Sequence, residues 1–179
     1  MKSAASWATA LIILIGLAVR VSAQEGEVAE GKFINAQGKK IGTVHIEHMS
    51  SATLFFLDLH GLPPGVHGIH IHSVGKCDPP DFASAGPHFN PSNAKHGMKN
   101  PQGPHAGDLP NITIPKSGKL QTEIMVAGDR QWSGEGGILD GDGASLVIHA
   151  GPDDYMTDPS GNSGARIACA KLDLPERQN

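Results

Sequence analysis

The sequence is poor in aromatic residues and in positive charge. Aromatic side chains make up 4% of its 179 residues, and 14 Lys and Arg residues face 18 Asp and Glu residues. The basic residues form no run anywhere along the chain. Proteins that bind nucleic acids need a basic surface and often stack aromatic side chains on bases. The composition therefore argues against nucleic-acid binding.

A hydrophobic run long enough to cross a membrane comfortably is also missing. The mostly apolar stretch Trp7–Val19 has 13 residues, whereas a spanning helix needs about 20. Lys2 precedes this stretch and the small residues at Val21–Ala23 follow it, an arrangement typical of a secretory signal peptide. We predict a signal peptide over residues 1–23, a mature domain over residues 24–179 without a membrane span, and a periplasmic or secreted location. An uncleaved N-terminal anchor is the alternative.

The mature chain of 156 residues is long enough for one domain with a sizeable core. Loss of Lys2 and Arg20 leaves 12 basic against 18 acidic residues, a net charge of −6 with His neutral. Cysteine is scarce, since only Cys77 and Cys169 occur. In an oxidising compartment they most simply form one disulfide, which the chain-entropy model values at roughly 4–5 kcal/mol for a loop of this size. Two free thiols are the alternative.

Helical periodicity is absent over any long stretch, and short alternating segments dominate. Val44 and Ile46 alternate with polar residues, Phe55, Leu57 and Leu59 mark one face of a second segment, and Leu120, Thr122, Ile124 and Val126 mark one face of a third. Glycine and proline residues separate these segments, as turns do. Many short strands with such breaks predict an all-β sandwich or barrel.

Residues 73–119 depart from this pattern and contain eight of the 13 prolines. An unstructured loop of this length is unusual inside a compact domain. It carries four potential metal ligands, namely His88, His96, His105 and Asp108. Because metal ions can supply cross-links that a hydrophobic core cannot, we expect this loop to be ordered by what it binds.

Further histidines flank the loop. His70 and His72 are two residues apart, so on a strand they share one face at a spacing of roughly 6.6 Å. His149 follows a later apolar run, Leu146–Ile148. Imidazole ligands suit zinc, copper, iron and nickel, so these residue types alone leave the metal open.

In order and spacing these motifs resemble the copper–zinc superoxide dismutases. The matching blocks are His70–His72, Gly86–Pro91, Lys95–Gly97, His105–Leu109, Leu146–His149 and Gly161–Cys169. The resemblance extends from about Glu27 to Lys171. It implies a Greek-key β-barrel of about eight antiparallel strands with long loops, and an enzyme that converts superoxide to dioxygen and hydrogen peroxide.

The resemblance also implies one copper and one zinc ion per chain. The residues that it assigns to copper are His70, His72, His88 and His149. Those that it assigns to zinc are His88, His96, His105 and Asp108. His88 would thus bridge both ions, return a proton to the product as copper alternates between two oxidation states, and count as catalytic.

Two further residues acquire roles from the resemblance. Arg166 would stand beside copper, attract the superoxide anion and count as the second catalytic residue, with Lys95 or Lys99 as additional sources of attraction. Asp153 would accept hydrogen bonds from His70 and His96, although its neighbour Asp154 is a competing assignment.

The remaining histidines are interpreted as structural. His67 has the wrong strand parity for the copper face, and His45, His48 and His60 are expected in strands or turns. Residues 111–113 form a glycosylation sequon. The early position of Cys77 resembles bacterial exported members of the family. A metal-binding or copper-carrier protein of the same fold without turnover is the alternative function, and a homodimer is possible.

Overall fold

The computed structural model describes residues 27–49, 51–128, 132 and 136–174. The signal peptide predicted over residues 1–23 lies outside this part of the chain. Nine strands and one short 3₁₀ helix are described. They are β1 (Glu27–Asn35), β2 (Lys40–Met49), β3 (Ala52–His60), β4 (Gly65–His67), β5 (Ile69–His72), η1 (Ala83–Ala85), β6 (Ile112–Ile114), β7 (Lys119–Ala127), β8 (Ala144–His149) and β9 (Arg166–Asp173).

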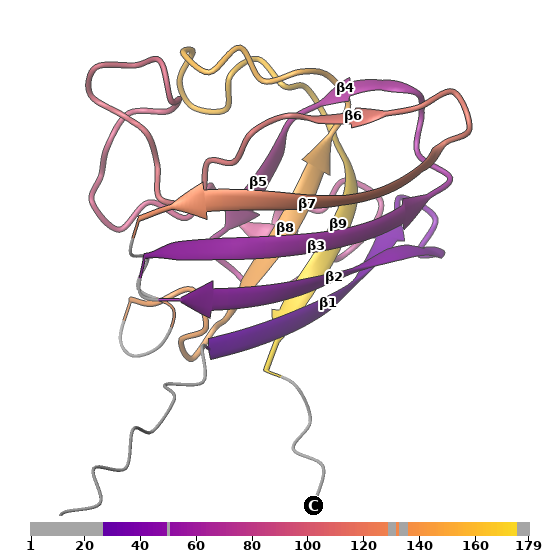
Figure 1. Cartoon of the computed structure of the whole chain (residues 1–179), viewed down its shortest axis with the longest axis horizontal. Helices are drawn as coiled ribbons and strands as arrows, with labels where there is room; N and C mark the ends of the chain where they lie inside the picture. Colours follow the sequence, from indigo (N-terminus) through magenta and orange to yellow (C-terminus); the bar gives the residue numbers. More distant parts are fainter. Residues whose placement is uncertain (1–26, 50, 129–131, 133–135, 175–179) are drawn as a thin grey trace, which may run out of the picture.

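Seven strands form one antiparallel sheet in the order β5-β8-β9-β1-β2-β3-β7, and β4 pairs separately with β6. Figure 1 shows this sheet curling round so that β8 and β9 cross behind β1, β2, β3 and β7. The order requires long connections between strands that are distant in sequence, because β5 pairs with β8 and β9 pairs with β1. The all-β sandwich or barrel predicted from the sequence, with antiparallel strands as the family resemblance implies, is therefore confirmed.

The barrel interior is filled by the apolar faces of alternating strands. In β3, Phe55, Leu57 and Leu59 are buried while the residues between them are more accessible. All residues of β5 and β8 are buried. Their inward residues, such as Ile71 and Leu146, belong to the main core, so something else must cover their outward face.

That cover is provided by two long loops, residues 73–111 and residues 150–165, which lie at one end of the barrel in Figure 1. The first loop is more regular than expected, since it includes η1 and is followed directly by β6. A disulfide joins Cys77 in this loop to Cys169 in β9. A second cluster of buried side chains surrounds the disulfide: Phe82, Ala85, Val147 and Cys169.

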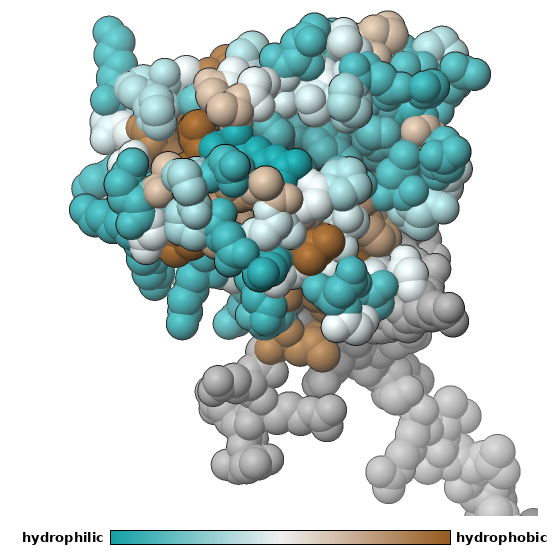
Figure 2. Space-filling model, turned by 180° about the vertical axis from the view of Figure 1, so that it is seen from behind, coloured by the Kyte–Doolittle hydropathy of each residue, from teal (hydrophilic) through white to brown (hydrophobic). Residues whose placement is uncertain are grey.

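The surface is mainly polar. The face in Figure 2 is largely hydrophilic, with hydrophobic residues in small separate groups. Among the described residues, no helix has the length and apolar character that crossing a bilayer requires.

Candidate metal centre

The centre begins on the outward face of β5 and β8, which pair with one another. His70 lies opposite Val147, and His72 lies opposite Ser145. Ile69 and Ile71 point inward, so strand alternation directs both histidines away from the core. His149 has the parity of Val147 and joins them at the end of β8. Three imidazoles from two neighbouring strands thus share one surface beneath the loops.

The ligands in the first loop reach this surface through backbone pairing. Isolated bridges connect His70 with Asp108 and His72 with His88. The backbone N–H of Ile71 donates to the carbonyl of Gly107 at 2.9 Å. A loop without apolar periodicity is therefore held against the edge of β5 by main-chain hydrogen bonds.

The first group of ligands consists of His70, His72, His88 and His149, whose ligand atoms all lie within 4.8 Å of one another. Hydrogen bonds fix three of the rings. His72 Nδ1 donates to Gly86 O at 2.8 Å, His149 Nδ1 donates to Gly164 O at 3.1 Å, and His70 Nε2 donates to Asp153 at 2.8 Å. The opposite nitrogen of each ring therefore carries a lone pair.

Those three nitrogens and Nε2 of His88 are buried and have no hydrogen-bond partner in the described part of the chain. They are His70 Nδ1, His72 Nε2, His88 Nε2 and His149 Nε2. A buried polar atom left unpaired is costly, and four of them converging on one point require an explanation. A bound metal ion provides it, because each nitrogen would donate its lone pair to the ion. The residues present fit a four-nitrogen copper site.

The second group consists of His88, His96, His105 and Asp108. Asp108 Oδ1 lies 3.0 Å from His88 Nδ1, 3.1 Å from His96 Nδ1 and 3.4 Å from His105 Nδ1. Ligands 2.0–2.1 Å from a tetrahedral zinc ion would be about 3.3 Å apart. The spacing therefore fits zinc, and His88 offers one ring nitrogen to each group.

The carboxylate of Asp108 is oriented by the backbone. Its Oδ2 atom accepts hydrogen bonds from Gly97 N at 2.9 Å and from His105 N at 3.0 Å. This leaves Oδ1 directed at the three imidazoles. Oδ1 of Asp108 is thus oriented as a metal ligand, and Oδ2 stabilises the loop by hydrogen bonds to its backbone.

Asp153 lies between the two groups and is fully buried. It accepts from His70 Nε2 at 2.8 Å and from His96 Nε2 at 3.0 Å. Asp154 instead accepts from backbone N–H groups of its own exposed turn, at Met156 and Thr157. Only Asp153 therefore braces one histidine from each group. A Cβ at Gly161 would clash with Asp153 Oδ1, so this position requires glycine.

The electrostatics of the two groups differ in the metal-free protein. Burial lowers the pKa of His70 to about 4 and that of His149 to about 3. Burial acts in the same direction on His96, but hydrogen bonds to Asp108 and Asp153 outweigh it and raise its pKa to about 9. The first group contains no carboxylate, so at neutral pH protons compete little with a cation for His70 and His149.

Solvent reaches the first group through a cleft whose walls include His72, His88, His149 and Arg166. Arg166 lies opposite His149 because a β-bulge shifts the register between β8 and β9 at this point. Its guanidinium donates to Phe82 O at 2.6 Å and to Gly86 O at 2.7 Å. Two carbonyls thus fix the arginine, and no described residue forms a direct ion pair that would neutralise it.

The two lysines proposed as additional sources of attraction lie elsewhere. Lys95 forms an ion pair with Asp158 at 2.7 Å, and Lys99 stands over the ring of Tyr155. Neither lines the cleft; among the described residues, Arg166 is its only lysine or arginine. A carboxylate, Asp81, also lines the cleft and partly offsets the positive charge.

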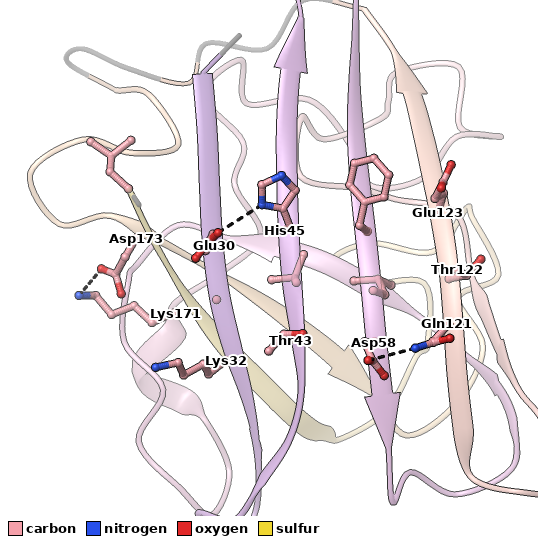
Figure 3. A pocket seen from close by; sticks show the side chains of 15 residues that line it. Glu30, Lys32, Thr43, His45, Asp58, Gln121, Thr122, Glu123, Lys171 and Asp173 are labelled. Atoms are coloured by element: carbon pink, nitrogen blue, oxygen red, sulfur yellow. Dashed lines mark hydrogen bonds and ion pairs between the residues drawn. The ribbon is translucent and has the colours of Figure 1, made fainter. Parts of the chain in front are cut away.

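The histidines expected to be structural lie outside both groups. His67 is buried, with Nδ1 2.7 Å from His149 O and Nε2 2.9 Å from Pro63 O. His45 lies on the outer face of β2 beside Glu30. Figure 3 shows this region as an open groove across β1, β2, β3 and β7, with side chains of both charges along it. Within the described ranges of the chain, no group of converging metal ligands lies in this groove.

Some contributions were not foreseen from the sequence. The carbonyls of Phe82 and Gly86, which hold Arg166, carry no sequence signal, because every residue has a carbonyl. Asp81 was not singled out. Asn111 was interpreted only as part of a sequon, although its position three residues after Asp108 could have drawn attention to it.

Comparison with known proteins gives a consistent result. Residues 40–172 match the family model described as copper/zinc superoxide dismutase (SODC). A protein named superoxide dismutase [Cu-Zn] 1 from Aquifex aeolicus is 46% identical over 138 residues, covering 76% of this chain and 82% of the relative. The crystal structure of a SOD-like protein from Bacillus subtilis is 41% identical with a TM-score of 0.73, covering 79% of this chain and 95% of that chain. Cu/Zn superoxide dismutase from Brucella abortus is 28% identical with a TM-score of 0.64, covering 82% and 100%.

Proposed function

The chain belongs to the copper/zinc superoxide dismutase family, and from this premise we propose that it is an exported enzyme that dismutates superoxide. The observation that carries the proposal is the set of four buried histidine nitrogens that have no hydrogen-bond partner among the described residues, three of them on histidines that line a cleft together with Arg166. Copper and zinc are the cofactors of the family, and the two ligand groups fit them.

The geometry of each ring supports the following assignment of ligands. His70 Nδ1, His72 Nε2, His88 Nε2 and His149 Nε2 would hold copper. His88 Nδ1, His96 Nδ1, His105 Nδ1 and Asp108 Oδ1 would hold zinc. Zinc would be enclosed by protein ligands on all four sides, which gives it a structural role, whereas the copper group opens to the cleft.

Copper, when bound, supplies one-electron redox chemistry, which oxidises one superoxide to dioxygen and reduces another to peroxide. The protein groups perform the remaining tasks. Arg166 attracts and orients the small anion with N–H groups not used by Phe82 and Gly86. When it is not bound to copper, His88 Nε2 can hold a proton and pass it to the reduced product, and solvent would supply the second proton of hydrogen peroxide. Asp153 keeps His70 and His96 in fixed orientations.

Two features of the chain and one feature of similar proteins support export. The N-terminal segment has the composition of a signal peptide. The disulfide between Cys77 and Cys169 is typical of an oxidising compartment. Several similar proteins named superoxide dismutase [Cu-Zn] come from bacteria. We therefore propose a periplasmic or secreted location.

The experiment that tests the function measures metal content and dismutase activity on the same purified sample, after loading with copper and zinc. We expect one copper and one zinc per chain, with activity lost when copper alone is removed. Both metals bound without activity would refute the proposal. That outcome would favour a metal-binding or copper-carrier role, a candidate kept open by the similarity to a protein described only as SOD-like.

A further inference from the structure

Asn111 makes a pair of hydrogen bonds with the main chain of Asp153. Its side-chain Nδ2 donates to Asp153 O at 2.9 Å, and its Oδ1 accepts from Asp153 N at 2.9 Å. The amide therefore pairs with the backbone as a neighbouring strand would. The two residues are 42 positions apart, so this contact fastens the loop of residues 150–165 to the start of β6.

Tyr155 closes this contact into a ring. The backbone N–H of Asn111 donates to Tyr155 Oη at 2.7 Å, and the backbone N–H of Tyr155 donates to Asp153 Oδ1 at 2.6 Å. Tyr155 adopts a left-handed φ of 64°, a conformation that a bulky residue rarely takes. In this turn Tyr155 therefore contacts both the carboxylate of Asp153 and Asn111, the residue that holds the backbone of Asp153.

The geometry points to Asn111 as a positioning residue for both metal sites. Asp153 donates no ligand atom to either group, yet its carboxylate fixes His70 and His96. A carboxylate can do this only if its own backbone is fixed, and Asn111 occupies both hydrogen-bonding groups of that backbone unit. The inference rests on the proposed function, because it takes copper and zinc as the bound metals.

The sequon of residues 111–113 has a structural explanation in this light. Both polar atoms of the Asn111 side chain are already engaged, and the side chain is only partly accessible. Thr113 points outward on β6 and makes no contribution to Asp153. The position of Asn111 is explained by its hydrogen bonds to Asp153, without glycosylation of its amide.

The test uses the copper- and zinc-loaded protein and measures the release of each metal to excess EDTA. Removing an outer hydrogen-bond partner of a metal ligand costs about 10–100-fold in metal affinity. We expect Asn111→Ala, acting one step further away, to release both metals about tenfold faster. Solvent exchange of the His96 Nε2–H proton, followed by NMR in the zinc-only protein, should accelerate as well.

The matched control is Asn35→Ala. Asn35 Oδ1 accepts from the backbone N–H groups of Gln37 and Lys39, so the variant also loses two side-chain hydrogen bonds, neither of them to a residue of the metal groups or to Asp153. We expect it to release metals at the wild-type rate. If Asn111→Ala does not fold, Asn111→Asp decides, because it keeps the shape and the acceptor for Asp153 N but replaces the donor to Asp153 O with a charged oxygen, so both metals should still be released faster than from the wild type.

A double-mutant cycle separates positioning from general loosening. In an Asp153→Ala background there is no carboxylate to position, so Asn111→Ala should add little to the release rate. Fully additive effects, or wild-type release from the Asn111 variant, would overturn the inference. A wild-type protein that retains both metals but does not dismutate superoxide would refute the proposed function alone, since metal release does not depend on turnover.

Discussion

Replacing Arg166 by Gln should slow dismutation about tenfold to a hundredfold at low ionic strength. The guanidinium is the only lysine or arginine group that lines the cleft among the described residues. Two unit charges 4 Å apart interact by about 1 kcal/mol in bulk water and about 4 kcal/mol at an effective dielectric constant of 20. A half-buried cleft lies between these limits, and 1.4 kcal/mol corresponds to a factor of about ten in rate.

The assay is the second-order rate of superoxide decay, measured after pulse radiolysis at several salt concentrations. Between about 0.01 and 0.15 M salt the Debye length falls from roughly 30 to 8 Å, so attraction by an exposed charge is progressively screened. The wild-type rate should fall over this range, and the Arg166→Gln rate should fall much less. Arg166→Lys should restore part of the rate, because it keeps the charge but loses the planar pair of bonds to Phe82 and Gly86.

The reasoning has two points at which it can fail. An unchanged rate for Arg166→Gln at low salt would show that this side chain does not attract the substrate. A reduced rate with the wild-type salt dependence would show that Arg166 acts by shaping the cleft, not through its charge. Metal content must be measured on each variant, because loss of copper would lower the rate for a different reason.

Three further outcomes are expected. His149→Ala should abolish dismutation and weaken copper binding at least about tenfold, while one zinc per chain remains, because His149 belongs only to the copper group. Equal loss of both metals on elemental analysis would contradict the division of ligands. Asp81→Asn should raise the rate of dismutation about two- to fivefold, because it removes a negative charge from the cleft and Asn can still accept from Ala83 N. The control is Asp58→Asn, which makes the same charge change in the outer groove and should leave the rate unaltered. The metal-free protein should lose stability as pH falls from 6.5 towards 4, because burial depresses the folded-state pKa of His70 to about 4 and the unfolded chain takes up the proton first. This histidine alone should lower the free energy of unfolding by about 3 kcal/mol. A melting temperature that is constant from pH 7 to 4.5 would contradict this prediction.

The sequence by itself determined the fold class and the chemical character of the centre. Alternation at Phe55, Leu57 and Leu59 indicates a strand with one buried face, and the structure has it so. The spacing of His70 and His72 requires a shared face on any strand, since side-chain direction repeats every two residues. These are local properties, fixed by backbone geometry.

Tertiary structure decided how the distant parts meet. Simple alternation along β9 would place Arg166 on the same face as Ala168 and Ala170, inside the barrel. Ile148 pairs with Ala168 but His149 pairs with Arg166, which leaves one extra residue in β9 at this point. This β-bulge turns the arginine towards the cleft instead. Asn111 and Asp153 likewise meet only because two loops dock on one another. Register shifts and loop docking depend on contacts between residues far apart in the chain, so local patterns in the sequence do not encode them.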